Sequence, residues 1–310
     1  MNKFPTAVIS LALSLGAVTA NADSDSDAQC STVKLADPGW SDIASTNAVA
    51  RLLLESLGYQ VKIDSLAVPI IYGGLKDGKV DAFLGNWMPA QQGFHDKFIA
   101  NGDVQKLSRN LQGTEFTLAV PDYVWNAGVK DFADLQKHAA QFDNKLYGIG
   151  SGAPANLSLK EIIDKNQFDL GKWKLVESSE QAMLTQVERA VKKHQFITFL
   201  GWTPHPMNVK LKMHYLTGGE QWFGSKGEVY TLVRKGYPQA CPNAAKLLAN
   251  LSFDLDMENS IMAQVVDNKV SFDVAAKDWL KAHPKRLQGW LAGVTAKEGG
   301  DALTAVKAKL

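Results

Sequence analysis

Near-continuous apolar segments alternate with amphipathic segments along most of the chain. Residues between the apolar runs predict one helix that Ser45 or Thr46 caps and Gly58 ends, and a short helix over 69–76. Strands that alternate with helices predict an α/β protein whose mainly parallel sheets are covered by helices. The apolar runs are typical of strands buried on both faces, and before residue 122 they lie at 32–36, 59–63, 80–84 and 116–121.

A second set of alternating elements follows residue 121. The segments 116–121 and 228–233 predict strands that connect the two sets, and the chain from Pro238 onward is mostly helical. We therefore expect two lobes, each a central sheet flanked by helices, with the two crossing strands as a hinge. The second set comprises helices 132–139, 154–165 and 179–192 and strands 146–149, 174–176 and 196–200. The expected division is 23–117 and 217–310 for lobe 1 and 118–216 for lobe 2.

Two of the expected strands lead into nearly the same sequence motif, which we call the repeated phrase. The first ends in Phe83-Leu84-Gly85-Asn86-Trp87-Met88-Pro89, and the second in Phe199-Leu200-Gly201-Trp202-Thr203-Pro204. Proline cannot donate to a strand ladder, so each phrase leaves a Trp in a loop at the carboxyl end of a strand, where ligands of α/β sheets bind. Two unrelated core tryptophans are the alternative. The repetition of this motif favours two lobes that each direct one Trp into a common site.

Other residues complete a candidate site for a cation. Trp40 follows the first strand, Phe116 lies at the first crossing, and Asp42 is close to Trp40 in the sequence. Several aromatic faces form a cage for a cation that cannot donate hydrogen bonds, and each face contributes about 0.5–2 kcal/mol. Asp42 adds an opposite charge and a hydroxyl acceptor. Core packing or stacking on a sugar is the alternative for each Trp alone.

The turn Gly150-Ser151-Gly152-Ala153-Pro154 opens a predicted helix. The backbone N–H groups of such a turn and the Ser151 hydroxyl could bind an anion, and a carboxylate fits better than a nucleotide because no phosphate-binding motif is present. A plain turn with a helix cap is the equally weighted alternative.

The N-terminus predicts export. Residues 1–22 combine Lys3, an apolar core too short to span a bilayer and an Ala20-Asn21-Ala22 cleavage site, so we expect a signal peptide that is removed. In an exported protein the only two cysteines, Cys30 and Cys241, favour a disulfide over a metal site. The segment before Cys30 lacks an apolar lipoprotein box, so no lipid anchor is expected.

Charge and motifs exclude several functions. The chain has 33 Lys and Arg residues against 32 Asp and Glu residues and no basic block, which argues against nucleic acid as a partner. No nucleophile elbow or zinc-binding pair of histidines occurs, so we expect neither an enzyme nor a cofactor or metal. His205, between two prolines, is expected at the rim of the pocket. The rival hypothesis is an exported hydrolase of choline esters that uses Ser151 and His205.

The motifs around Trp40, Trp87 and Trp202 resemble those of the choline/glycine betaine/carnitine substrate-binding proteins of ABC transporters, in particular the choline-binding branch. The resemblance covers essentially the whole chain after the signal. It implies a monomeric, two-lobed periplasmic binding protein of type II-like fold that closes on a quaternary ammonium ligand and delivers it to a membrane permease. It also assigns the three tryptophans to the cage and Asp42 to the polar end of the ligand.

Two positions differ from the choline-binding pattern. Phe116 stands where that branch has a Tyr, and Ala153 stands where it has an Asn that helps to hold the choline hydroxyl. The loss of one hydroxyl partner beside the turn at Ser151 and Gly152 favours a longer ligand with a carboxylate. The expected order is carnitine before glycine betaine, with carnitine also tighter than choline.

Overall fold

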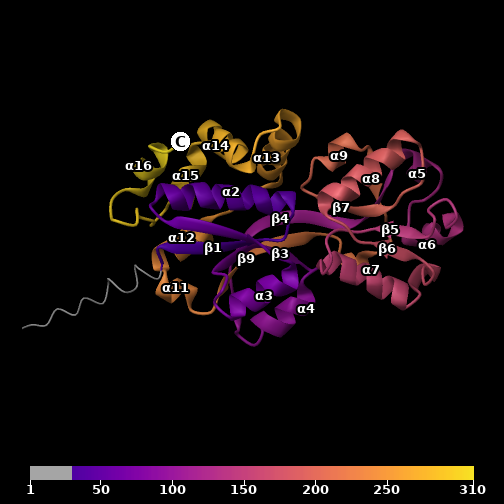
Figure 1. The fold of residues 1–310 in the computed structure, drawn as a ribbon, viewed down its shortest axis with the longest axis horizontal. Coiled ribbons are helices and arrows are strands. Elements are labelled where there is room, and N and C mark those ends of the chain that lie inside the picture. The colour runs from indigo at the N-terminus through magenta and orange to yellow at the C-terminus, as the bar shows by residue number, and fades with distance from the viewer. Residues whose placement is uncertain (1–29) are drawn as a thin grey trace, which may run out of the picture.

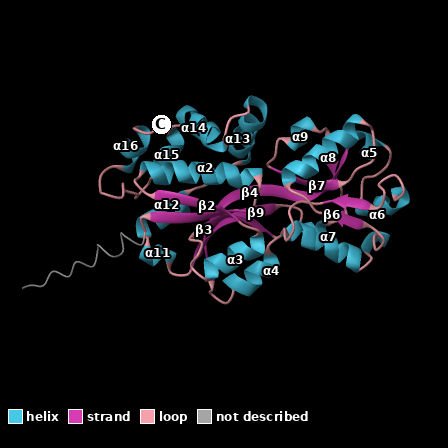
Figure 2. Ribbon diagram, viewed as in Figure 1, coloured by secondary structure: helices cyan, strands magenta, loops and turns pink. Residues whose placement is uncertain are grey.

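The computed structural model describes residues 30–310, so the signal peptide expected at 1–22 lies outside the described residues. Within the described range, the strands follow one another in the order β2-β1-β3-β9-β4-β7-β5-β6, with β8 beside β4. Helices cover both faces of this series of strands (Figures 1 and 2). The α/β class predicted from the alternating pattern is confirmed.

The strands fall into two groups that share β4. We call the first group sheet A, in which β1 lies between β2 and β3, and β9 joins β3 to the first part of β4. The second group, sheet B, contains the end of β4, β7, β5 and β6, and β8 pairs with the last residues of β4. The strands are β1 (Thr32–Asp37), β2 (Gln60–Ser65), β3 (Ala82–Met88), β4 (Val104–Pro121), β5 (Lys145–Tyr147), β6 (Lys174–Val176), β7 (Phe199–Thr203), β8 (Met213–Tyr215) and β9 (Gly227–Arg234).

The sheets are mixed, whereas the sequence predicted mainly parallel ones. β1 is parallel to β2 and β3, and β5 is parallel to β6 and β7, but every pair that involves β4 or β9 is antiparallel. The prediction was wrong for these pairs because an apolar run reports burial on both faces and carries no information about strand direction.

β4 is the strand that passes from one sheet to the other. It pairs with β9 as far as Thr114, opposite Gly227, and with β7 from Glu115, opposite Thr203. Phe116 therefore lies directly after the change of partner. β9, the expected return crossing, pairs with β3 and β4 in sheet A.

The helices form two layers on each sheet. In Figure 1 the C-terminal helices α13 to α16 lie beside α2 over sheet A, so the end of the chain packs back on its beginning. α3 and α4 cover the other face of sheet A, and α7 and α8 lie on opposite sides of sheet B. The helices are α2 (Ser41–Ser56), α3 (Val68–Lys76), α4 (Gln92–Phe94), α5 (Asp122–Asn126), α6 (Phe132–Leu135), α7 (Pro154–Asp164), α8 (Glu180–Lys192), α9 (Met207–Lys210), α10 (Glu220–Phe223), α11 (Tyr237–Ala240), α12 (Pro242–Asn250), α13 (Leu255–Asn268), α14 (Phe272–Ala282), α15 (Lys285–Trp290) and α16 (Ala302–Lys307). Short 3₁₀ segments at 136–138 and 167–169 and a π-helical turn at 95–99 complete the set. No helix in the described part of the chain is long and apolar enough to cross a membrane.

Several element boundaries differ from the predictions, and three of them concern Asp42, Trp87 and Trp202. α2 begins at Ser41 and not after Ser45, so Asp42 lies in the first turn of the helix. Trp87 and Trp202 lie inside β3 and β7, where loops were expected. These strands continue to the last residue before each proline, because their backbones still pair with β9 and β4.

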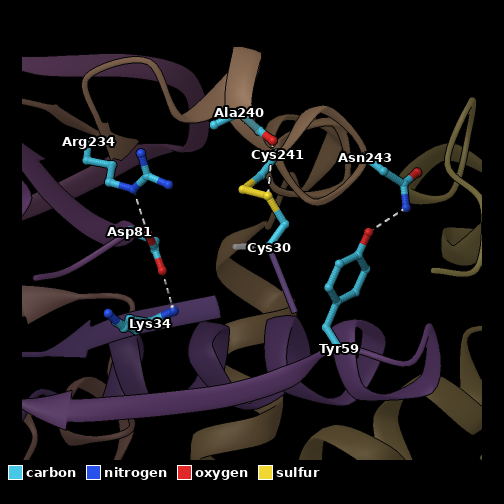
Figure 3. The surroundings of a disulfide bond; sticks show 8 residues. All are labelled: Cys30, Lys34, Tyr59, Asp81, Arg234, Ala240, Cys241 and Asn243. Carbon is cyan, nitrogen blue, oxygen red and sulfur yellow. Dashed lines mark hydrogen bonds and ion pairs between the residues drawn. A yellow bond between two sulfur atoms is a disulfide. The ribbon is translucent and has the colours of Figure 1, made fainter. Parts of the chain in front are cut away.

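The disulfide predicted from the cysteine count is present. Cys30 at the start of β1 is joined to Cys241 between α11 and α12, 211 residues later in the sequence (Figure 3). Beside it, the Asp81 carboxylate accepts hydrogen bonds from Arg234 Nε at 2.7 Å and from the backbone N–H of Lys34 at 2.9 Å. The N-terminal strand is thus tied to the returning chain by a covalent bond, and also through Asp81, which bonds to Lys34 on one side and to Arg234 on the other.

Candidate functional site

One cavity lies where β3, β4, β7 and the start of α2 meet. Its volume is about 460 Å³, solvent at the mouth included. Apolar and aromatic side chains dominate its lining. The lining residues are Trp40, Asp42, Trp87, Ala90, Gln91, Phe116, Ile149, Pro154, Ala155, Leu200, Gly201 and Trp202.

The four predicted aromatic residues all line this cavity. Phe116 on β4 and Trp202 on β7 are directly opposite each other in the antiparallel pair. The ring of Trp87 on β3 stands edge-on to Phe116, with centroids 6.2 Å apart and an interplanar angle of 89°. Trp40, immediately before α2, supplies the fourth ring. The cavity therefore receives aromatic faces from both sheets.

The two repeated phrases have the same local structure. Each Trp lies near the end of a strand, and the proline after it follows a cis peptide bond, Met88–Pro89 in one copy and Thr203–Pro204 in the other. The glycine of each phrase also has a packing reason. A Cβ on Gly201 would lie 2.8 Å from Met213, and one on Gly85 would lie 2.7 Å from the ring of Phe83. Only glycine lets these neighbours approach the strand so closely.

Asp42 is the acidic residue of the lining. It is 1% exposed, and its Oδ2 accepts a hydrogen bond from Trp87 Nε1 at 2.9 Å. Burial, and secondly the negative charge of Glu180, raise the pKa of Asp42 from an ordinary 3.8 to about 7, although the Trp87 bond acts in the opposite direction. A cation bound in the cavity would favour the ionised carboxylate.

The chemistry of the lining suits a cation that makes no hydrogen bonds. Lys, Arg and His do not occur among the described residues around this cavity. The amide of Gln91 is already bonded to the fold, because it donates to the carbonyl of Gly85 and accepts from the Tyr72 hydroxyl. What remains for a ligand is a set of aromatic faces and one carboxylate.

The predicted turn lies next to this cavity and not in its lining. Ser151 and Ala153 line a second cavity of about 430 Å³, which shares Trp40 with the first. Gly152 lines neither of the two cavities, and its φ of +80° forms the turn beside Pro69. The N–H of Ala153 is already bonded to the carbonyl of Gly150 at 3.0 Å, which reduces the donors available to an anion.

His205 is buried but does not line the aromatic cavity. Its Nε2 lies 3.2 Å from Glu180 Oε1, and its Nδ1 accepts from the backbone N–H of Met207 at 3.0 Å. The hydrolase hypothesis needed Ser151 and His205 to be partners. Ser151 is instead an exposed residue of the second cavity.

Sequence reasoning missed several lining residues. Leu200 and Gly201 belong to the repeated phrase, so their proximity to Trp202 could have suggested them. Ile149, Pro154 and Ala155 approach the cavity from the β5–α7 connection of sheet B, and no local pattern marks them. They are small or apolar side chains that only the packing of the two sheets brings to the site.

Comparisons with known proteins agree with this description. Residues 31–282 match the family described as the substrate-binding domain of the ABC-type glycine betaine transport system. The chain is 45% identical over 128 residues to the uncharacterized protein ORF1 of Chromohalobacter salexigens, which covers 41% of this chain and 83% of that protein. It is 30% identical over 161 residues to the glycine betaine/carnitine transport binding protein GbuC of Listeria monocytogenes, which covers 52% of this chain and 53% of that protein.

Solved structures are similar over nearly the full described chain. An ABC-transporter choline-binding protein in complex with choline is 44% identical, with a TM-score of 0.89, and the match covers 91% of this chain and 98% of that one. Lactococcal OpuAC, in its closed conformation with glycine betaine, is 27% identical, with a TM-score of 0.76. The match covers 84% of this chain and 98% of that one.

The fold and the aromatic cavity define a substrate-binding protein of a membrane transport system, a class of binding proteins and not of enzymes. The chain belongs to the family of substrate-binding domains of ABC-type glycine betaine transport systems, and it is the extracytoplasmic binding protein of a transporter for quaternary ammonium compounds. The resemblance stated from the Trp motifs is confirmed.

Proposed function

We propose that the aromatic cavity captures a quaternary ammonium compound that has no carboxylate, with choline as the preferred ligand. The observation that carries this proposal is the lining itself, in which Trp40, Trp87, Phe116 and Trp202 surround one buried carboxylate, Asp42. The trimethylammonium group would lie against the rings, and the hydroxyl would donate to Asp42. A ligand carboxylate would instead meet Asp42 without a basic partner.

The preference for carnitine expected from the sequence depended on donors in the turn at Ser151. That turn opens into the second cavity, which shares only Trp40 with the first. Carnitine would have to extend past Trp40 to place its carboxylate there, and the N–H of Ala153 is already bonded. Carnitine is therefore the second candidate, and glycine betaine, whose carboxylate stays nearer to the ammonium group, is the third.

We infer that the two sheets belong to two lobes that close around the ligand. β4 and the segment before β9 connect the lobes, and aromatic residues reach the cavity from both sheets. The chain has a TM-score of 0.89 to a choline-binding protein in complex with choline and of 0.83 to a choline-binding protein in an unliganded semi-closed conformation. This difference supports a closed conformation for the described chain. Residues 23–117 and 217–310 would form lobe 1 and residues 118–216 lobe 2.

The same proposal places the protein in the periplasm as a monomer that delivers its ligand to the permease subunits of the transporter. The N-terminal signal expected at 1–22, the disulfide and the family support export.

Calorimetric titration with choline, carnitine and glycine betaine tests the function. We expect choline to bind at least about tenfold more tightly than either carboxylate ligand, which corresponds to ~1.4 kcal/mol. Tighter binding of carnitine would overturn the assignment of choline and restore the order expected from the sequence. No heat of binding with any of the three would overturn the proposed function as a whole.

A further inference from the structure

Glu180 is a buried carboxylate that connects the two halves of the fold. It is the first residue of α8, beside sheet B, and its side chain is 1% exposed. Its Oε2 accepts a hydrogen bond from the backbone N–H of Ser41 at 3.0 Å, and its Oε1 accepts one from the Ser41 hydroxyl. Ser41 begins α2, which packs beside sheet A, so both bonds pass from one half to the other (Figure 1).

The N-terminus of α2 has no capping side chain from its own segment. The N-cap position is occupied by Trp40, whose indole makes no capping bond. The first N–H groups of a helix lack partners within the helix, and the helix dipole attracts a negative charge to this end. Glu180 supplies both the acceptor and the charge from a different helix.

His205 holds Glu180 from the other side. Because Nδ1 of His205 accepts from the backbone N–H of Met207, the proton of the neutral ring lies on Nε2, which is 3.2 Å from Glu180 Oε1. The ring of His205 also packs edge-on against Trp202, with centroids 5.1 Å apart. His205 therefore fixes the position of Glu180 relative to Trp202, which forms one wall of the cavity.

Ser41 has cavity residues on both sides in the sequence. Trp40 supplies one aromatic face and Asp42 the carboxylate. The bonds from Glu180 to Ser41 fix the backbone between these two residues relative to Trp202, which comes from the other sheet. They can exist only while the two halves are together, since opening would separate α2 from α8.

We propose that Glu180 is a positioning residue that latches the two lobes around the bound cation and slows its release. This inference rests on the proposed function. Because the latch forms after the ligand has entered the open cleft, its loss should raise the rate of dissociation and leave the rate of association nearly unchanged. Hydrogen bonds to a charged group are stronger than bonds between neutral groups, and these bonds are buried. The increase in the dissociation rate should therefore be measurable.

The test uses choline and stopped-flow tryptophan fluorescence, in which the dependence of the observed rate on concentration gives both rate constants. We expect Glu180→Gln to dissociate choline at least about tenfold faster, equivalent to ~1.4 kcal/mol, with association changed less than about twofold. Ser41→Ala, which removes only the hydroxyl, should give a smaller increase in the same direction. The double variant should be no faster than Glu180→Gln alone, because both changes remove the same interaction.

Glu177→Gln is the matched control. Glu177 lies three residues earlier, and among the described residues its carboxylate bonds to Asn156 and Lys160, both in the same half. The dissociation rate of this variant should equal that of the unmodified protein. Thermal unfolding of each ligand-free variant identifies any general loss of stability.

Each outcome bears on a separate idea. If choline binds and Glu180→Gln dissociates it at the unmodified rate, the latch is refuted while the proposed function stands. Equal acceleration in Glu180→Gln and Glu177→Gln would also refute it, because a general loosening would then suffice. If the unmodified chain binds neither choline nor carnitine nor glycine betaine, the proposed function and the latch fall together.

Discussion

Replacing Asp42 with Asn removes the acidic side chain among the described lining residues and keeps an oxygen that can accept the Trp87 bond. In the ligand-free protein, burial and the charge of Glu180 raise the pKa of Asp42 to about 7. A bound cation stabilises the ionised carboxylate and lowers this pKa. Binding therefore releases a proton wherever Asp42 is protonated beforehand, and affinity must rise with pH up to about 7.

The size of the effect follows from proton linkage. Below a pKa of about 7, each pH unit should weaken binding about tenfold, or ~1.36 kcal/mol, until the lower pKa of the complex is reached. Between pH 8 and pH 6 the unmodified protein should lose about a factor of ten in affinity, and Asp42→Asn should show no such change. Calorimetry with choline over this range measures both slopes, and buffers of different ionisation enthalpy measure the released proton directly.

The ligand-free stability should change in the opposite direction. The pKa of Asp42 is higher in the folded protein than its ordinary value of 3.8, so its contribution to stability is complete below that value and is lost as pH rises to about 7. The loss relative to Asp42→Asn is on the order of 4 kcal/mol. The pKa of Glu258 is raised by burial and, secondly, by the charge of Asp42. Asp42→Asn removes that charge, so the measured difference contains a contribution from Glu258 as well.

Equal pH dependence of choline affinity in the unmodified protein and in Asp42→Asn would refute this reasoning. It would mean that the ligand does not interact with an ionised Asp42, whatever the cavity binds.

Three further predictions concern the cage, the disulfide and the turn. Trp87→Ala and Trp202→Ala should each weaken choline binding at least about tenfold, because the loss of a desolvated aromatic face costs roughly 1–2 kcal/mol; unchanged calorimetric affinity in both variants would exclude the cage. Thiol titration of the unfolded, unreduced protein should find no free thiol, and replacing Cys30 and Cys241 with Ser should lower the free energy of unfolding in denaturant titrations by about 5 kcal/mol, because the closed loop is so long. Ala153→Asn should change the ratio of choline to carnitine affinity by less than about twofold, because Ala153 lines the second cavity and not the aromatic one; a larger shift in competition assays would contradict this.

Local patterns in the sequence determined the elements and much of the cage. Apolar runs and helical spacing located most strands and helices, because burial and period are properties of neighbouring residues. The repeated Gly, Trp and Pro phrases pointed to Trp87 and Trp202 for a similarly local reason. Proline ends a strand wherever it occurs, and glycine marks a close approach of other side chains to the backbone.

Only the tertiary structure decided what depends on residues far apart in the chain. The sequence could not show that a single long strand, β4, pairs first with β9 and then with β7, or that the turn at Ser151 opens into a separate cavity. It also could not show that Glu180 caps α2 from another helix, since 139 residues separate it from Ser41. The pKa of Asp42 has the same origin. Burial and a nearby negative charge raise the pKa of a carboxyl group, and both depend on the tertiary fold and not on the neighbouring residues in the sequence.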